Sequence, residues 1–320
     1  MFVRRQLDWI KESQVFQRLR RGVPDEELRS PFEKATLPAY CIITLFLVGL
    51  FLAFRLTYFH LDSKGLLSPI VTFLSLLLGG IALRRYGHTR IAGSTEAIGI
   101  IGFFSLLTAF SLAMLCATNL PFADDLLIRA DAALGFSWIA LFHGIENMPR
   151  LLSLLTVIYK SIEWQPIFLA TVLMILNRPR QLWTFVNAWI ISLTITVAIF
   201  PFFPARAAIN YHGLSAQDGI HSADFLVWMQ GLRNGSIRSI DYSSITGIVT
   251  FPSFHASTAI LFAWGFASVP NIRWIILIIN LAMLFATIII GGHYLVDIIG
   301  GVLIAALAIW LSTISAKRLS

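Results

Sequence analysis

Charged residues are scarce in this chain. Asp, Glu, Lys and Arg make up 13% of its 320 residues, whereas hydrophobic residues make up 57%. Soluble globular proteins carry about 25% charged residues, so the composition excludes an ordinary water-soluble domain. Uncharged runs of about 18 residues or more are long enough to cross a membrane as helices. We therefore predict an all-α polytopic membrane protein.

Cysteine is also scarce, and the chain contains only Cys41 and Cys116. Both fall inside apolar runs and form no CxxC or other metal-ligand spacing. His212 and His221 lie in a long loop and also lack such a spacing. We therefore expect packing or lipid-facing thiols, assign the two loop histidines no role, and predict no metal site.

About eight apolar stretches are candidate membrane spans. They are Leu37–Tyr58, Leu66–Leu83, Ala97–Asn119, Leu151–Leu176, Leu182–Phe203, Ser253–Val269, Ile272–Ile290 and Tyr294–Ser315.

The net charge of +7 comes from Lys and Arg that gather between alternate spans and at both ends of the chain. The positive-inside rule assigns such segments to the cytoplasm. The pattern therefore predicts two cytoplasmic termini, and it argues against nucleic acid as the partner. The basic clusters lie in residues 1–36, at Arg84–Arg90, at Asn177–Arg180, at Arg273 and at Lys317–Arg318.

Residues 1–36 form a charged cytoplasmic segment without an apolar core of signal-peptide length, so we do not expect a cleaved signal. Apolar residues recur at roughly helical spacing from Phe2 to Leu19. This predicts either a helix lying on the inner leaflet or a solvated tail whose charge only sets the topology.

Two longer segments then face outward. Pro121–Arg150 carries apolar residues at helical spacing through Ala130–Gly144, which predicts one short interfacial helix. Pro204–Phe251 is the largest loop, and loops of this length are usually functional or disordered. The polar motifs that flank it favour function.

Arg206 and His255 stand on either side of this loop. The Arg206 guanidinium suits phosphate oxygens, although contact with lipid headgroups explains it equally well. His255 lies in the sequence Phe251-Pro252-Ser253-Phe254-His255, where Pro and Ser indicate the first turn of a helix. A helix N-terminus favours an anion, but a single histidine there is more often an ordinary interface residue.

His293 and Asp297 are four residues apart, so on a helix they would share one face. A carboxylate so placed holds one ring nitrogen and leaves the other aimed at substrate, as in a catalytic triad. An acidic residue inside an apolar span is by default functional, and a purely structural His–Asp pair is the alternative. The sixth span runs inward from His255 and the seventh returns to His293, so topology predicts both histidines and Arg206 at the outer face.

Together the three motifs resemble the type 2 phosphatidic acid phosphatase superfamily, and in particular its inositol phosphorylceramide synthase-like branch. The resemblance covers about Ala97 to Ser315. It implies a six-helix phosphatase or phosphotransferase core at 97–315, preceded by two additional spans at 37–96.

The resemblance also implies roles for single residues. His293 would attack phosphorus and form a phosphohistidine, and Asp297 would orient it. His255 would protonate the leaving oxygen and then activate water or an acceptor hydroxyl, while Arg206 and Ser253 would hold the phosphoryl oxygens. Imidazole is a competent nucleophile and acid–base group, and positive charge stabilises the transition state. No cofactor is expected.

Two cations of the family pattern are missing, because Ile199 and Ala286-Thr287 occupy their positions. The inositol phosphorylceramide synthase-like branch also tends to lack the second of them. The candidates to replace this charge are Arg233, Arg238 and Lys160. Lys160 could instead pair with Glu163, three residues away.

Three functions remain open. The first is hydrolysis of a lipid phosphomonoester or diphosphate at the periplasmic or other extracytoplasmic face, on a phospholipid, sphingolipid or polyprenyl phosphate. The second is transfer of a phosphoryl headgroup to a lipid or sugar hydroxyl. The third is non-enzymatic lipid transport or binding.

Overall fold

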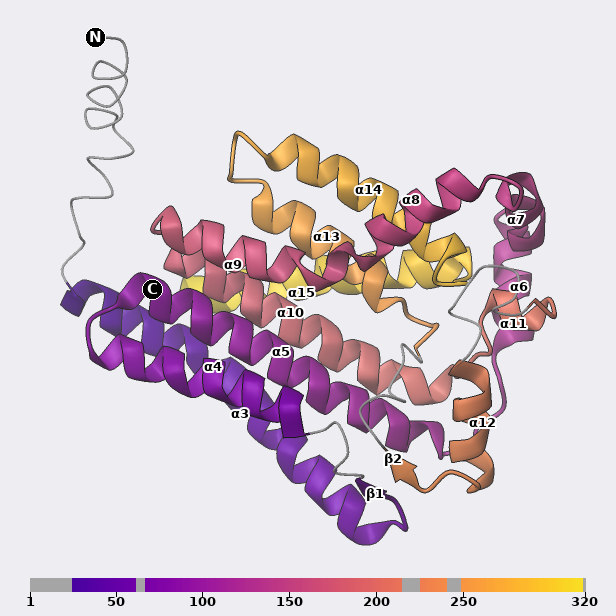
Figure 1. The fold of residues 1–320 in the computed structure, drawn as a ribbon, viewed down its shortest axis with the longest axis horizontal. Coiled ribbons are helices and arrows are strands. Elements are labelled where there is room, and N and C mark those ends of the chain that lie inside the picture. The colour runs from indigo at the N-terminus through magenta and orange to yellow at the C-terminus, as the bar shows by residue number, and fades with distance from the viewer. Residues whose placement is uncertain (1–24, 62–66, 215–224, 241–248, 319–320) are drawn as a thin grey trace.

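The structure, a computed structural model, describes residues 25–61, 67–214, 225–240 and 249–318. Long helices pack side by side into one bundle, and short helices gather at one of its ends, on the right in Figure 1. The elements in chain order are α3 (Asp25–Leu56), β1 (His60–Leu61), α4 (Leu67–Arg85), α5 (Thr89–Cys116), α6 (Asp124–Ala133), α7 (Trp138–Ile145), α8 (Pro149–Tyr159), η1 (Lys160–Glu163), α9 (Gln165–Ile175), α10 (Pro179–Ile199), η2 (Phe200–Phe202), α11 (Ala208–Tyr211), α12 (Phe225–Asn234), β2 (Ser239–Ile240), α13 (Phe254–Phe266), α14 (Arg273–Ile289) and α15 (Leu295–Arg318).

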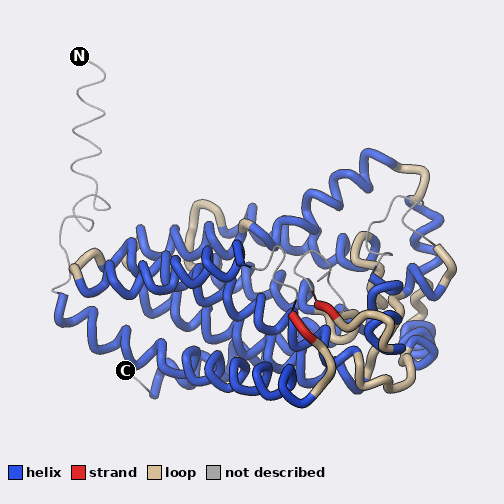
Figure 2. The backbone as a smooth tube through the Cα atoms, turned by 60° about the horizontal axis from the view of Figure 1, so that its bottom comes forward, coloured by secondary structure: helices blue, strands red, loops and turns tan. Residues whose placement is uncertain are grey.

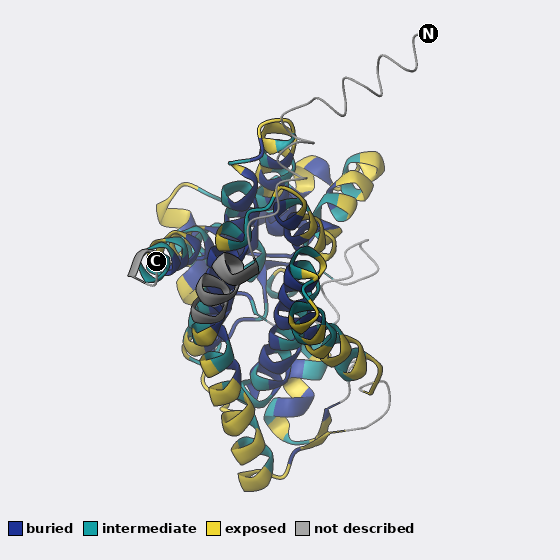
Figure 3. Ribbon diagram, turned by 90° about the vertical axis from the view of Figure 1, so that its left-hand side faces the viewer, coloured by how far each residue is buried: buried dark blue, intermediate teal, exposed yellow. Residues whose placement is uncertain are grey.

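The prediction of an all-α polytopic membrane protein is confirmed. Five described helices are long and apolar enough to cross a membrane, and α9, α13 and α14 are shorter apolar helices. Exposed residues cover the outside of the bundle (Figure 3), and large apolar side chains such as Leu45, Phe51 and Leu303 are among them. Such a surface suits hydrocarbon rather than water. The free thiols also agree with expectation, since Cys41 is exposed on α3 and Cys116 is buried at the end of α5.

The fourth predicted span, Leu151–Leu176, is not one continuous helix. It consists of α8, the 3₁₀ turn η1 and α9. Pro166 stands in the first turn of α9, where it supplies no backbone donor, and a proline disfavours helical conformation in the residue before it. The sequence Gln165-Pro166 therefore ends one helix and starts another.

A buried polar network packs this break against α14. The Gln165 side chain donates to Ser161 Oγ (2.8 Å), and the Asn280 side chain donates to Gln165 Oε1 (2.8 Å). Polar side chains between membrane helices hydrogen-bond across the interface in this way. The network fixes where η1 meets the bundle.

The single interfacial helix predicted through Ala130–Gly144 is also wrong. The segment forms α6 and α7, which meet at an angle of 80°. Gly135 has a φ of +73°, a conformation that ends a helix, and the side chain of Ser137 caps α7 by accepting from the Ala140 amide. The apolar spacing continues across the break, so it could not reveal the turn.

The long outer loop, Pro204–Phe251, contains α11, α12 and β2. Strand β2 pairs in parallel with β1, with His60 opposite Ser239 and Leu61 opposite Ile240. Figure 2 shows the two strands together beside one end of the bundle. Because β1 connects α3 to α4, the first two spans hold the outer loop. The predicted surface helix Phe2–Leu19 and His221 lie outside the described residues.

The first two spans also join the core through a buried carboxylate. Glu96 of α5 is fully buried and accepts hydrogen bonds from Tyr40 of α3 and from Arg84 of α4 (2.9 Å). A buried charge must be paired to be tolerated in a membrane protein. This cluster therefore ties α3, α4 and α5 together.

Helices α4 and α5 approach closely because glycine lies at their contact. A Cβ on Gly80 would lie 2.7 Å from the Glu96 backbone nitrogen, whereas a Cβ on the neighbouring Gly79 would meet nothing within 4 Å. Small residues allow membrane helices to pack in this way.

We expect Gly80→Val to destabilise the protein by about 1–3 kcal/mol, because the added side chain would push α4 away from α5. Gly79→Val is the matched control, and it should leave the thermal unfolding midpoint in detergent nearly unchanged. Equal midpoints for the two variants would contradict this packing.

Candidate active site

His293 and Asp297 form a buried pair at the end of the bundle where the short helices gather (Figure 1). His293 Nδ1 lies 3.2 Å from Asp297 Oδ2, and the same oxygen accepts the Tyr294 amide (3.0 Å). His293 is 4% exposed and Asp297 is fully buried. The contact engages Nδ1, so Nε2 is the nitrogen left for chemistry.

The helical geometry expected for this pair is wrong in one respect. Helix α15 begins at Leu295, so His293 lies in the connection before the helix rather than on its face. The pair still forms, because the Tyr294 amide binds the same carboxylate oxygen and folds the connection back over Asp297. The spacing of four therefore reflects a turn at the helix start.

Two glycines before His293 make this turn possible. Gly292 has a φ of +65°, and a Cβ there would lie 2.8 Å from the Ile209 side chain. A Cβ on Gly291 would lie 2.5 Å from the Thr287 carbonyl oxygen. Positive φ and close backbone contacts both require glycine.

The motif around Ser253 packs directly against this turn. Ser253 is the N-cap of α13, its amide donates to the Asp297 carbonyl (3.0 Å), and its Oγ lies 3.5 Å from His293 Nε2. Gly301 permits the contact, since a Cβ there would lie 2.2 Å from the Ser253 carbonyl oxygen. Nε2 of His293 thus faces the N-terminus of α13, where backbone amides and the helix dipole favour an anion.

Tyr159 stacks on His255 beside the glycine turn that precedes His293, and sequence reasoning missed it. Its ring stacks on the His255 ring with centroids 4.0 Å apart, and its Oη lies 3.4 Å from His255 Nδ1. The same ring lies 3.2 Å from the Cβ position of Gly291, two residues before His293. Tyrosine at the end of an apolar helix carries no special sequence signal.

Arg206 is held by a second residue that sequence reasoning missed, the buried carboxylate of Asp124. Asp124 accepts the Arg206 amide (3.0 and 3.1 Å), Arg206 Nε (3.2 Å) and the Tyr294 hydroxyl (2.8 Å). The amide of Ala208, two residues after Arg206, donates to the Gly292 carbonyl (2.8 Å). Arg206 is thereby attached to the connection that carries His293.

Asp131 lies seven residues after Asp124 on α6 and acts on the same connection. Its two carboxylate oxygens accept the amides of Leu295 and Val296, each at 2.9 Å. These amides open α15, so Asp131 satisfies donors that a helix start leaves free. The spacing of seven residues is two helical turns, which was the available signal.

The three candidate replacement cations occupy different places. Arg233 stacks on the Phe122 ring at 4.3 Å, and Arg206 contacts the same ring at 5.5 Å. Partial burial lowers the pKa of Arg233. Arg238 instead stacks on Tyr58, at the end of the first span. Lys160 is exposed on η1, next to Tyr159.

The structure therefore brings Arg233 near Arg206 and leaves Arg238 with the N-terminal spans. No ion pair joins Lys160 to Glu163 in the part of the chain that the structure describes. His212 stacks on Trp138. Within the described ranges, no group of three or more His, Cys, Asp or Glu side chains is arranged to hold a metal ion.

Comparison with known proteins identifies the family of this chain. A family model described as the PAP2 superfamily matches residues 125–311, which is more than half of the chain and includes all three motifs. Neither the curated proteins nor the solved structures gave a match. Members of this superfamily are generally phosphatases or phosphotransferases. The buried His293–Asp297 pair, facing Ser253 beside His255, thus belongs to a membrane protein of the PAP2 superfamily.

Proposed function

We propose that this protein hydrolyses a lipid phosphomonoester or diphosphate through a phosphohistidine intermediate at the outer membrane face. The observation that carries the proposal is the orientation of His293. Asp297 engages Nδ1 at 3.2 Å, while Nε2 faces Ser253 Oγ at the start of α13, 3.5 Å away.

The reaction has two steps. In the first, the lone pair of His293 Nε2 attacks phosphorus, the bond to the leaving oxygen breaks, and protonated His255 gives that oxygen a proton. In the second, neutral His255 takes a proton from water, the water oxygen attacks the phosphohistidine, and inorganic phosphate leaves. Ser253 Oγ, the amides of α13 and Arg206 hold the phosphoryl oxygens, where positive charge lowers the barrier.

Asp124 serves this site as a positioning residue. It touches Arg206 and Tyr294, which flank the phosphate site, and is 1% exposed. One buried carboxylate thereby sets the distance between the arginine of the first motif and the histidine of the third. Charge-assisted hydrogen bonds of this kind are the strong ones in proteins.

A phosphotransferase is the second candidate. Ile199 and Ala286-Thr287 replace two family cations, and Thr287 uses its hydroxyl to bond the Met283 carbonyl within α14. The inositol phosphorylceramide synthase-like branch resembles this chain in lacking the second cation. In that reaction a lipid or sugar hydroxyl, rather than water, would attack the intermediate.

The orientation in the membrane is part of the proposal. Both termini would lie in the cytoplasm, and α6, α7, α11 and α12 would cover the site on the extracytoplasmic side. Residues 97–315 would form the catalytic core. The two spans at 37–96 would hold the outer loop through the β1–β2 pair.

We expect His293→Ala to lower kcat/KM for phosphatidate by at least about 10³-fold, because the nucleophile is lost. His143→Ala, an exposed histidine paired with Glu146, is the matched control. Rapid quench in alkaline detergent with ³²P-labelled substrate should trap a labelled protein in the wild type and not in His293→Ala, and acid should release the label. A non-enzymatic transporter would show neither labelling nor turnover.

The products of the same incubation separate the two enzymatic candidates. Free phosphate formed without any acceptor supports hydrolysis. A new phosphodiester lipid that appears only when an acceptor alcohol is present supports transfer.

We expect Asp124→Asn to lower kcat/KM by about 10- to 100-fold, because a hydrogen bond to a charged group contributes about 1.5–3 kcal/mol. Asp125→Asn, the exposed neighbour that accepts from Tyr211, is the control and should change kcat/KM less than about threefold.

If Asp124 acts through Arg206, the double variant Asp124→Asn/Arg206→Ala should be little worse than Arg206→Ala alone. Fully additive losses would assign Asp124 a general structural role instead.

The orientation predicts opposite labelling of two engineered cysteines in a protein whose Cys41 and Cys116 are replaced by Ala. A membrane-impermeant maleimide added to intact cells should label Asn234→Cys, on the exposed end of α12. It should label Tyr86→Cys, at a residue 81% exposed after α4, only after permeabilisation. The reverse pattern would place the site in the cytoplasm.

A further inference from the structure

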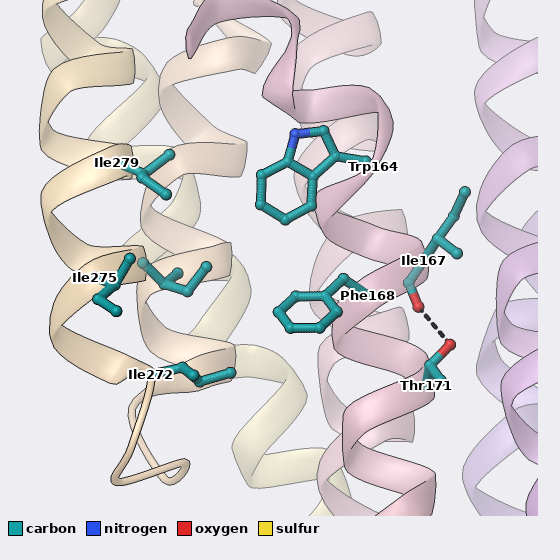
Figure 4. A pocket seen from close by; sticks show the side chains of 8 residues that line it. Trp164, Ile167, Phe168, Thr171, Ile272, Ile275 and Ile279 are labelled. Carbon is teal, nitrogen blue, oxygen red and sulfur yellow. Dashed lines mark hydrogen bonds between the residues drawn. The ribbon is translucent and has the colours of Figure 1, made fainter.

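The membrane-facing wall between α9 and α14 contains a groove of about 590 Å³. Trp164, which precedes α9, and Phe168 of α9 form one side, and Ile275 and Ile279 of α14 form the other (Figure 4). These side chains are accessible from outside, since Trp164 is 43% and Ile275 60% exposed. The groove therefore opens toward the hydrocarbon that surrounds the bundle.

The lining of the groove suits a hydrocarbon chain. It is isoleucine and aromatic apart from Thr171, whose hydroxyl donates to the Ile167 carbonyl (2.8 Å), as drawn in Figure 4. The hydroxyl is thus already satisfied within α9. A polar ligand would find little to bind here, whereas a flexible apolar chain gains contact on two sides.

The groove lies at a defined depth below the histidines. Trp164 and Thr171 follow Tyr159, which stacks on His255, by five and twelve residues. From Trp164 to Thr171 the groove extends about 10 Å along α9, starting directly after the 3₁₀ turn η1 that follows that stack. One leaflet supplies about 15 Å of hydrocarbon, so a chain attached to a phosphate at His255 reaches the groove.

Helix α13 connects the groove to the histidine site. Phe168 in the groove packs on Phe266 with ring centroids 5.5 Å apart, and Phe266 is the last residue of the helix that begins beside His255. The groove is therefore packed, through Phe168, against the last residue of the helix whose first turn faces the phosphate. Binding energy from such a remote part of a substrate positions the reacting group.

The upper end of the groove is suited to a headgroup. Lys160 and Glu163 are exposed on η1, immediately above Trp164. Lysine can extend its ammonium to the interface while its methylenes stay in hydrocarbon, and tryptophan favours the same depth. An anionic headgroup passing η1 would meet Lys160 before it reaches the histidines.

We propose that the α9–α14 groove binds a hydrocarbon chain of the lipid substrate whose phosphate lies between His255 and His293. The proposal rests on the proposed function and adds a chain-binding site to it. The substrate then reaches the site from within the bilayer, past Lys160 of η1.

Ile275→Trp tests the proposal, because a large ring there fills the groove. Ile278→Trp is the matched control, since Ile278 lies on the same helix, is 67% exposed and does not line the groove. We expect Ile275→Trp to lower the ratio of kcat/KM for long-chain over short-chain phosphatidate about tenfold, the effect of losing contact with about two methylenes. The control should keep the wild-type ratio, and equal ratios for both variants would overturn the proposal.

A measurement independent of turnover separates this proposal from the proposed function. Wild-type protein is irradiated with a phosphatidate that carries a diazirine near its chain end, and in parallel with the same probe on phosphatidylcholine. We expect the phosphatidate probe to label α9 and α14 peptides severalfold more than the phosphatidylcholine probe does. Equal labelling would mean that these helices contact only bulk lipid. It would reject the groove as a substrate-binding site, even if the protein hydrolyses phosphatidate. Selective labelling without hydrolysis would keep the groove and reject the phosphatase.

Discussion

A carboxylate buried in a membrane protein must find hydrogen-bond donors, because no water is present to solvate it. At the end of this bundle that holds the two histidines, the donors are the backbone amides and side chains of the site itself. Asp297 accepts from the His293 connection, Asp131 accepts the first amides of α15, and Asp124 accepts from Arg206 and Tyr294. The hydrogen bonds that these carboxylates accept are therefore also the contacts that assemble the site, although Asp297 Oδ1 has no hydrogen-bond partner among the described residues.

Close backbone contacts make this arrangement possible. Gly301 lets α15 touch the Ser253 carbonyl, and Gly291 and Gly292 let the chain turn between α14 and His293. The starts of two helices, α13 and α15, are thereby joined by the hydrogen bond from the Ser253 amide to the Asp297 carbonyl (3.0 Å). Anion binding at a helix start and a histidine–carboxylate pair are thus combined on one rigid base.

The sequence predicted the class of fold, and it failed at local breaks. The catalytic roles that it assigned stay predictions. Apolar run length identifies membrane helices because the bilayer thickness sets it, and span direction placed His255 and His293 at one surface. The same periodicity continues through Gln165-Pro166 and through Gly135. The prediction therefore treated α8 and α9 as one helix, and α6 and α7 as another. The acidic residues of α6 stand in an amphipathic pattern that also fits an ordinary interfacial helix.

What the sequence determined by itself was the membrane fold, through its apolar runs, and the residue types of the three motifs, through their chemistry. Only the tertiary structure decided which of these residues contact one another. Arg206 meets Asp124 across 82 residues, Tyr159 meets His255 across 96, and Leu295 meets Asp131 across 164. Local periodicity carries no information over such separations, because these contacts depend on how helices pack and on which buried polar groups must be satisfied.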